Sequence, residues 1–215
     1  MKAVSFTRRD LRGWVAAATL RCRSEPARRR IVALATLVLA LPVAAQERYD
    51  PAATIAAQQQ AMAALRSMHG AWRGPAWILL PGGEKREFVQ TERIGPFLDG
   101  SVEVIEGRGH DAAGKPAFNA FGIVSYDPAT RTYAMRSYAQ GRSGDFVFTP
   151  TPDGYRWEIP AGPATIRYRA VIRDGSLHEI GERVVSGQEP VRIFEMTLKR
   201  LGDSDWPAAG AIGPR

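Results

Sequence analysis

The stretch TIRYRAVIRDG, residues 165–175, alternates apolar and charged side chains up to an Asp-Gly turn signal. Its apolar side chains share one side of an extended chain: Ile166, Tyr168, Ala170 and Ile172. The same period of two recurs in DGYRWEIP, residues 153–160, and in PVRIFEMTLKR, residues 190–200. Such alternation predicts antiparallel strands with one apolar face and one solvated face.

Nine turn signals separate ten such segments between residues 70 and 201. Most segments have the length of roughly 8–12 residues that is typical of a sandwich or barrel. Ten strands joined by hairpins close most simply into a meander barrel without exposed edges. The sequence therefore predicts an all-β fold, a roughly ten-stranded antiparallel meander barrel over residues 70–201. A polar start and one helix precede it in residues 46–69, and residues 202–215 form a disordered tail with Trp206 docked on the barrel.

The charge of the chain is concentrated at its N-terminus. The 215 residues carry a formal net charge of +7, but residues 1–45 hold nine basic and two acidic side chains. Residues 46–215 hold twenty of each sign. A balanced domain with interspersed charges argues against nucleic acid as a partner.

Residues 28–46 have the layout of an export signal. Three arginines precede the apolar run IVALATLVLALPV, and Ala44 and Ala45 follow it. This run is shorter than the roughly 20 residues of a membrane span, so we expect a Sec-type signal cleaved after Ala45. Residues 1–45 are thus assigned to export, with an N-terminal extension that a misassigned start codon would explain. The mature chain is expected in the periplasm or outside the cell, without a stable membrane span; an uncleaved anchor is the alternative.

Cys22 is the only cysteine, and it lies in the segment expected to be removed. The mature chain then has no disulfide and no thiol chemistry, so a hydrophobic core alone must stabilise it.

Several blocks resemble known barrels. Gly70-Ala71-Trp72 resembles the G-x-W motif of lipocalin-type (calycin) barrels, in which the tryptophan plugs the closed end and a basic residue stacks on it; Arg200 is the matching position, with Lys199 as the alternative. The blocks at residues 92–109, 122–138 and 178–183 resemble an uncharacterised family of exported bacterial proteins with lipocalin-like barrels. This resemblance implies the fold and the exported setting, and no catalytic residues.

A barrel of this size can hold one small ligand between its walls. We expect an apolar or amphipathic molecule in the interior, with Trp72 closing one end and polar anchors at His178 and Glu182. The expected wall residues are aromatic side chains and methionines: Tyr126, Tyr133, Met135, Phe146, Trp157, Tyr168 and Met196.

No cofactor or metal is expected. The spacing of His69, His110 and His178 fits no zinc motif. Nitrobindin-type relatives of these barrels bind haem through a histidine near the last strand, and that strand here contains none; His178 on the preceding strand is the only substitute.

Two alternatives to a binding protein remain. One is an isomerase- or hydrolase-type enzyme that uses Glu182 or His178, and the other is a filled barrel that engages a partner. Paired carboxylates facing one cavity would support catalysis. We interpret the candidates Glu92, Glu158, Glu179 and Glu182 as solvated strand faces neutralised by arginines. The sequence indicates no catalytic residue and no oligomeric state.

Overall fold

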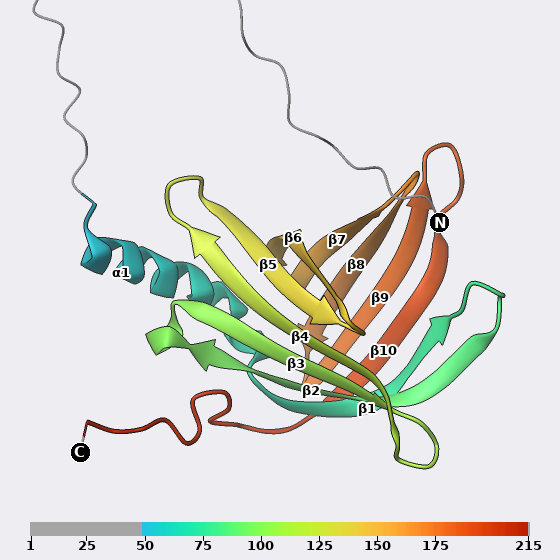
Figure 1. The fold of residues 1–215 in the computed structure, drawn as a ribbon, viewed down its shortest axis with the longest axis horizontal. Coiled ribbons are helices and arrows are strands. Elements are labelled where there is room, and N and C mark those ends of the chain that lie inside the picture. Colours follow the sequence, from blue (N-terminus) through green and yellow to red (C-terminus); the bar gives the residue numbers. More distant parts are fainter. Residues whose placement is uncertain (1–48, 215) are drawn as a thin grey trace, which may run out of the picture. The chain divides into compact units, whose positions relative to one another are not determined.

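The computed structural model describes residues 49–214. It contains a closed barrel of ten antiparallel strands, in which β1 pairs with β10 and every other strand pairs with its neighbours in sequence (Figure 1). The predicted all-β meander barrel with one preceding helix is confirmed. The strands are β1 (Gly70–Leu79), β2 (Lys85–Phe97), β3 (Val102–His110), β4 (Pro116–Asp127), β5 (Thr132–Ala139), β6 (Arg142–Thr151), β7 (Gly154–Ala161), β8 (Ala164–Arg173), β9 (Ser176–Val185) and β10 (Val191–Gly202).

The helix before the barrel changes type halfway. The α-helix α1 (Pro51–Met62) starts at Asp50, whose side chain accepts hydrogen bonds from the amides of Ala52 and Ala53. It continues as the 3₁₀ helix η1 (Ala63–Met68), where the sequence predicts no break. Side chains three apart eclipse in a 3₁₀ helix, so Leu65 and Met68 point the same way and both are buried.

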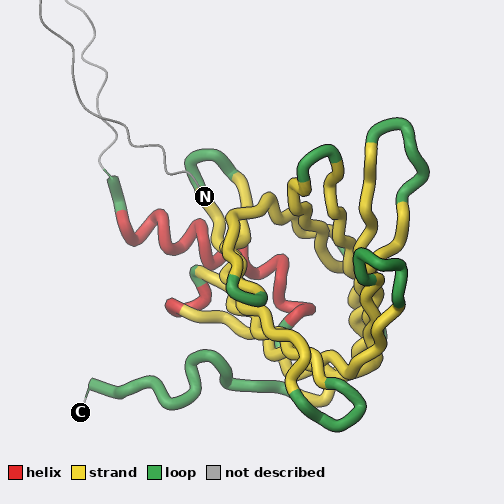
Figure 2. Tube along the Cα trace, turned by 45° about the vertical axis from the view of Figure 1, so that its right-hand side comes forward, coloured by secondary structure: helices red, strands yellow, loops and turns green. Residues whose placement is uncertain are grey.

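The helical segment closes one end of the barrel (Figure 2). Met62, Leu65 and Met68 join the barrel core there, together with Trp72, whose indole Nε1 donates to the carbonyl of Met68 at 2.8 Å. The Tyr133 hydroxyl donates to the carbonyl of Ala61 at 2.9 Å. The strand ends and turns away from the helix lie at the opposite end, which we call the mouth (Figure 2).

Arg200 lies beside this plug. It is the register partner of Trp72 on the neighbouring strand. Its guanidinium donates to the carbonyl of His69 at 3.2 Å from both Nε and Nη2. Arg200 therefore ties the last strand to the residue that precedes the first one.

A buried acid, Glu103, lies near the closed end. Glu103 is fully buried, and its Oε2 lies 2.9 Å from Nε2 of His69. Burial raises the pKa of Glu103, and the bond to His69 opposes that rise. His69 thus bonds to a buried acid.

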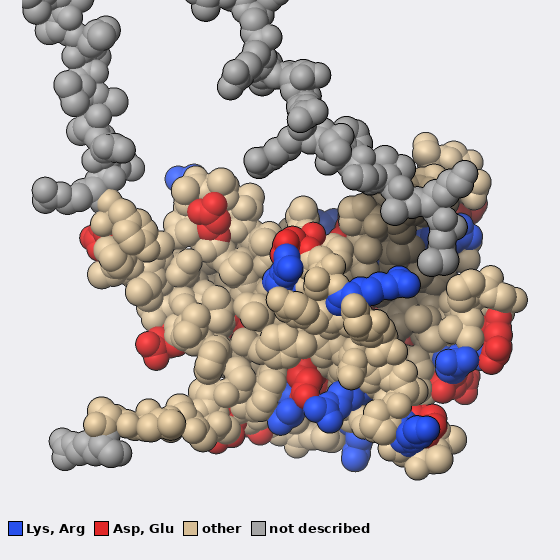
Figure 3. All heavy atoms as spheres, in the orientation of Figure 1, with Lys and Arg blue, Asp and Glu red and all other residues tan. Residues whose placement is uncertain are grey.

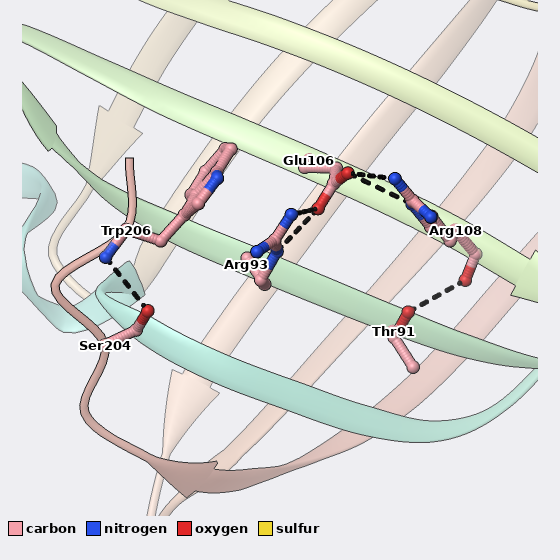
Figure 4. A network of polar contacts seen from close by, with 6 residues as sticks. All are labelled: Thr91, Arg93, Glu106, Arg108, Ser204 and Trp206. Atoms are coloured by element: carbon pink, nitrogen blue, oxygen red, sulfur yellow. Dashed lines mark hydrogen bonds and ion pairs between the residues drawn. The ribbon is translucent and has the colours of Figure 1, made fainter. Parts of the chain in front are cut away.

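The chain after β10 folds back over the outside of the barrel (Figure 4). The ring of Trp206 lies 4.7 Å from the guanidinium carbon of Arg93, and Arg93 donates to Glu106 at 2.6 Å. Arg108 binds the other oxygen of Glu106 at 2.7 Å. Gly95 is essential to this contact, because a Cβ there would lie 2.2 Å from the carbonyl oxygen of Trp206. Trp206 thus packs on β2.

The pairing between β6 and β7 covers fewer residues than any other strand pairing in the barrel. Only four residue pairs join these strands, from Phe148 with Trp157 to Thr151 with Gly154. A hollow of about 560 Å³ on the outer face of this seam is lined mostly by exposed residues: Val147, Thr149, Arg156, Trp157, Glu158 and Arg167.

Candidate functional site: the barrel interior

The structure brings eight of the ten expected site residues to the inner face. Trp72, Met135 and Met196 belong to the buried core, and Tyr126, Tyr133, Phe146 and Trp157 pack against it. Tyr168 stacks on Trp157. Within this set, Trp72, Tyr126 and Tyr133 lie at the closed end near the helix. What these residues bind stays a prediction.

A continuous aromatic ladder runs across the strands of the inner wall, from β6 to β10. The ring centres of Phe146 and Trp157 lie 5.8 Å apart, those of Trp157 and Tyr168 lie 4.1 Å apart, and those of Tyr168 and Phe194 lie 5.9 Å apart. Gly181 lies on β9, between Tyr168 on β8 and Phe194 on β10. A Cβ at Gly181 would lie 2.7 Å from the Tyr168 ring. The missing side chain allows the rings of β8 and β10 to meet across β9. All four rings are half-buried, so the inner wall stays partly open to solvent.

Glu179 lies at the base of this ladder. Its side chain is buried, accepting a hydrogen bond from the indole Nε1 of Trp157 at 2.9 Å and a longer one from the Tyr155 hydroxyl at 3.5 Å. Burial raises the pKa of Glu179 to about 7, although both hydrogen bonds favour the ionised form. A carboxyl group that titrates near neutrality thus faces the barrel interior.

Glu92 is a second buried carboxyl on the inner face. Gln90 donates its side-chain amide to Oε1 of Glu92 at 2.6 Å, and both residues are buried. Burial raises the pKa of Glu92 to about 8, against the Gln90 hydrogen bond, and the charges of Glu179 and Glu106 add to the rise. On the facing strand, a Cβ at Gly107 would lie 2.8 Å from Oε1 of Glu92, so glycine leaves the room that this carboxyl occupies.

The interpretation of the carboxylates as solvated strand faces is wrong for Glu92 and Glu179. It holds for Glu158, which is exposed and accepts a hydrogen bond from Arg167 at 2.7 Å. The alternation Leu177, Glu179, Gly181 places Glu179 on the core face, because Leu177 is a core residue. The sequence contained that signal, but Ile180 on the opposite face is also buried and made the outer face look apolar.

His178 and Glu182 do not face the interior, and their expected role as polar anchors there is wrong. Both lie on the face of β9 opposite to Glu179, because side chains alternate along a strand. His178 binds Oε1 of Glu195 through Nε2 at 2.8 Å, and its side chain is 44% exposed. The enzyme alternative built on this pair loses its structural basis.

The described part of the chain holds no group of three or more His, Cys, Asp or Glu side chains that could bind a metal ion. Within residues 49–214, no helix combines the length and apolar character needed to cross a membrane. On the face drawn in Figure 3, acidic and basic side chains lie interspersed.

Comparisons with known proteins give a likeness of fold only. No protein-family model and no curated protein sequence matches the chain. Among solved structures, the barrel is similar to the crystal structure of Rv2717c from M. tuberculosis, with 15% sequence identity and a TM-score of 0.49. The match covers 67% of this chain and 98% of that one.

Proposed function

We propose that the protein binds a small amphipathic molecule in the barrel interior, through the mouth. The observation that carries this proposal is the half-buried Trp157–Tyr168 stack directly above the buried carboxyl of Glu179. Apolar walls with a few buried polar groups at one end are typical of ligand pockets. The apolar part of the ligand would lie against the aromatic ladder, and its polar end would reach the carboxyl groups.

The two ends of the barrel differ in a way that favours a ligand over a filled interior. At the closed end, Trp72 and Phe148 are 1% and 2% exposed, as in a finished core. Towards the mouth, Phe146, Trp157 and Tyr168 point inward and remain half-buried. Large aromatic rings that stay partly exposed on an inner wall often mark a binding site, and a bound ligand would cover their exposed surface.

A fluorescence titration tests the proposal. The neutral probe N-phenylnaphthylamine should gain emission in the barrel, and fatty acids, lipids or aromatic compounds that bind should displace it. Trp157→Ala should weaken probe binding several-fold. Trp77→Ala is the matched control, because Trp77 lies on β1 with Lys85 over its ring, outside the ladder. Unchanged emission and unchanged melting temperature across the library would overturn the proposal.

A second candidate function is acid–base catalysis on such a ligand, of isomerase or hydrolase type. The observation that favours it is the pair of inward carboxyls, with a pKa of about 8 for Glu92 and about 7 for Glu179. Groups that titrate near the working pH are the effective general acids and bases. Turnover in an activity screen that Glu179→Gln abolishes and Glu182→Gln preserves would establish catalysis; ligand binding without turnover would reject it.

We also propose that the protein is exported to the periplasm or beyond. The support is the sequence of residues 28–46, which lie outside the described residues. N-terminal sequencing of protein purified from its native host should give a chain that begins at Gln46. A mature chain that begins before Arg28 would refute the cleavage.

A further inference from the structure

The floor of the aromatic wall is rich in hydrogen-bond acceptors and poor in donors. Gln90 is 3% exposed, and its Oε1 has no hydrogen-bond partner, although its amide nitrogen is bonded to Glu92. Leaving a buried amide oxygen unpaired costs about 1–3 kcal/mol. This unpaired oxygen belongs to the side chain that binds the buried carboxyl of Glu92, so one buried acceptor beside that carboxyl has no donor.

No basic side chain neutralises the two carboxyls. Among the described residues, neither Glu92 nor Glu179 forms an ion pair, whereas Glu106, on the outer face of the same wall, binds both Arg93 and Arg108. A buried carboxylate without a cation is costly, and proteins normally pair it or keep it protonated. The barrel interior therefore contains acidic groups whose positive partner the chain itself does not supply.

The groups that face this cluster from the surrounding strands are neutral or acidic. They are Trp72 and Gly74 from β1, Gln90 from β2, Gly107 from β3, Tyr155 and Trp157 from β7, Tyr168 from β8 and Met196 from β10. Arg183 has the same parity as Glu179 on β9, but it lies four residues nearer the mouth and is exposed. The pKa values of Tyr155 and Tyr168 are raised by burial, so both phenols stay neutral.

The aromatic residues beside the cluster turn their polar edges towards it. The indole Nε1 of Trp157 and the hydroxyl of Tyr155 both donate to Glu179, and the rings of Trp157 and Tyr168 stack on each other with 7° between their planes. Two carboxyls and an unpaired amide oxygen are acceptors that suit a charged donor such as an organic cation.

We infer that the ligand is an organic amine or amidine whose cationic group binds to Glu92, Glu179 and Gln90. This inference rests on the proposed function and specifies the polar end of the ligand. An ammonium group has three donors and no acceptor, which matches a set of acceptors made of two carboxylates and the Gln90 oxygen. Its apolar body would lie along Trp157 and Tyr168, towards the mouth.

Protons should leave the protein when the cation binds. With pKa values of about 8 and about 7, Glu92 is mostly protonated and Glu179 about half protonated at neutral pH in the free barrel. A bound ammonium ion favours the ionised carboxylates. Their protons pass to the solvent, and no covalent bond forms or breaks. A neutral ligand would release none.

Three compounds distinguish a cationic ligand from a neutral or an anionic one: phenylbutylamine, phenylbutanol and phenylbutyrate. They share a phenylalkyl chain and differ in their polar group. Isothermal titration calorimetry at pH 8 should give at least about tenfold tighter binding of the amine than of the alcohol, the value of one charge-assisted hydrogen bond. Titrations in two buffers of different ionisation heat should show proton release for the amine alone. Amine binding should weaken about tenfold or more at pH 5.5, where both carboxyls are protonated.

The variants Glu92→Gln and Glu179→Gln each test the inference, since both keep the side-chain shape. Either should remove the preference for the amine while phenylbutanol still binds. Glu182→Gln, on the outer face of β9, is the matched control and should change nothing. If the alcohol binds the unaltered protein as tightly as the amine, the inference fails and the proposed function stands. If none of the three compounds nor N-phenylnaphthylamine binds, both fail.

Discussion

The indole Nε1 of Trp157 donates a hydrogen bond to Oε1 of Glu179 at 2.9 Å. This bond joins the aromatic ladder to the buried acid beneath it. It also places a fluorescent side chain in direct contact with a group whose pKa burial raises to about 7. The protonation of Glu179 should therefore be visible in the emission of Trp157.

Tryptophan emission should change with pH, with a midpoint near pH 7, because ionised Glu179 is a stronger acceptor for the indole than its neutral form. Glu179→Gln should abolish this transition, and so should Trp157→Phe, which removes the reporter. Fluorescence of the unliganded protein between pH 5 and 9 measures the effect. A transition that survives Glu179→Gln would assign it to another group.

Stability should fall as pH rises through the neutral range. The folded-state pKa values of Glu92 and Glu179 lie above the ordinary glutamate value of 4.5, so the folded chain binds protons that the unfolded chain has lost. The stabilisation is complete below about pH 4.5 and is lost as pH rises towards 8. Each carboxyl contributes a fall of up to about 1.4 kcal/mol per pH unit within its window.

Urea unfolding of the unaltered protein and of Glu92→Gln at pH 5.5 and pH 9 measures this effect. We expect the variant to be more stable than the parent at pH 9, because it buries no charge there, and to have a smaller difference between the two pH values. Glu158→Gln is the control, since Glu158 is exposed on the outer face. A parent protein that is equally stable at both pH values would contradict the prediction.

Local patterns were sufficient to predict the barrel but not its buried acids. Period-two alternation gives the correct inner face for Tyr155, Trp157 and Tyr168, because it follows from strand geometry alone. In β9 two apolar residues of opposite parity, Leu177 and Ile180, are both buried, so hydrophobicity does not identify the inner face. The register with β8 and β10 identifies it, and register is a long-range property that no single strand contains.

The closed end has a second feature that the sequence did not predict. Composition predicts a helix before the barrel, but not that its last turn tightens into a 3₁₀ helix and enters the core. That change depends on the space left between strands, which Leu65, Met68 and Trp72 fill together. The partnership of His69 with Glu103 likewise joins residues 34 positions apart and has no local signal.

Leu65→Ala should destabilise the barrel by about 2–5 kcal/mol, the usual cost of a buried leucine cavity. Leu65 is 1% exposed and lies in the core with Met62 and Met68, so the closed end would lose its filling. Ile55→Ala, on the same helical segment but 45% exposed, should change the free energy of unfolding by no more than about 0.5 kcal/mol. Urea unfolding compares the two. Equal effects would show that the helix does not contribute to the core.

The docked tail depends on the absence of a side chain at Gly95, so Gly95→Ala should release it. The new Cβ would lie 2.2 Å from the Trp206 carbonyl oxygen, a distance that only displacement of the tail relieves. Trp206 would then leave Arg93, and a protease that cleaves before aspartate should cut at Asp203 and Asp205 several-fold faster. Trp206→Ala should have the same effect through loss of the cation–π contact, worth about 0.5–1 kcal/mol. Gly82→Ala is the control, because no atom lies within 4 Å of its added Cβ. Cleavage rates that Gly95→Ala leaves unchanged would mean that the contact on β2 does not hold the tail.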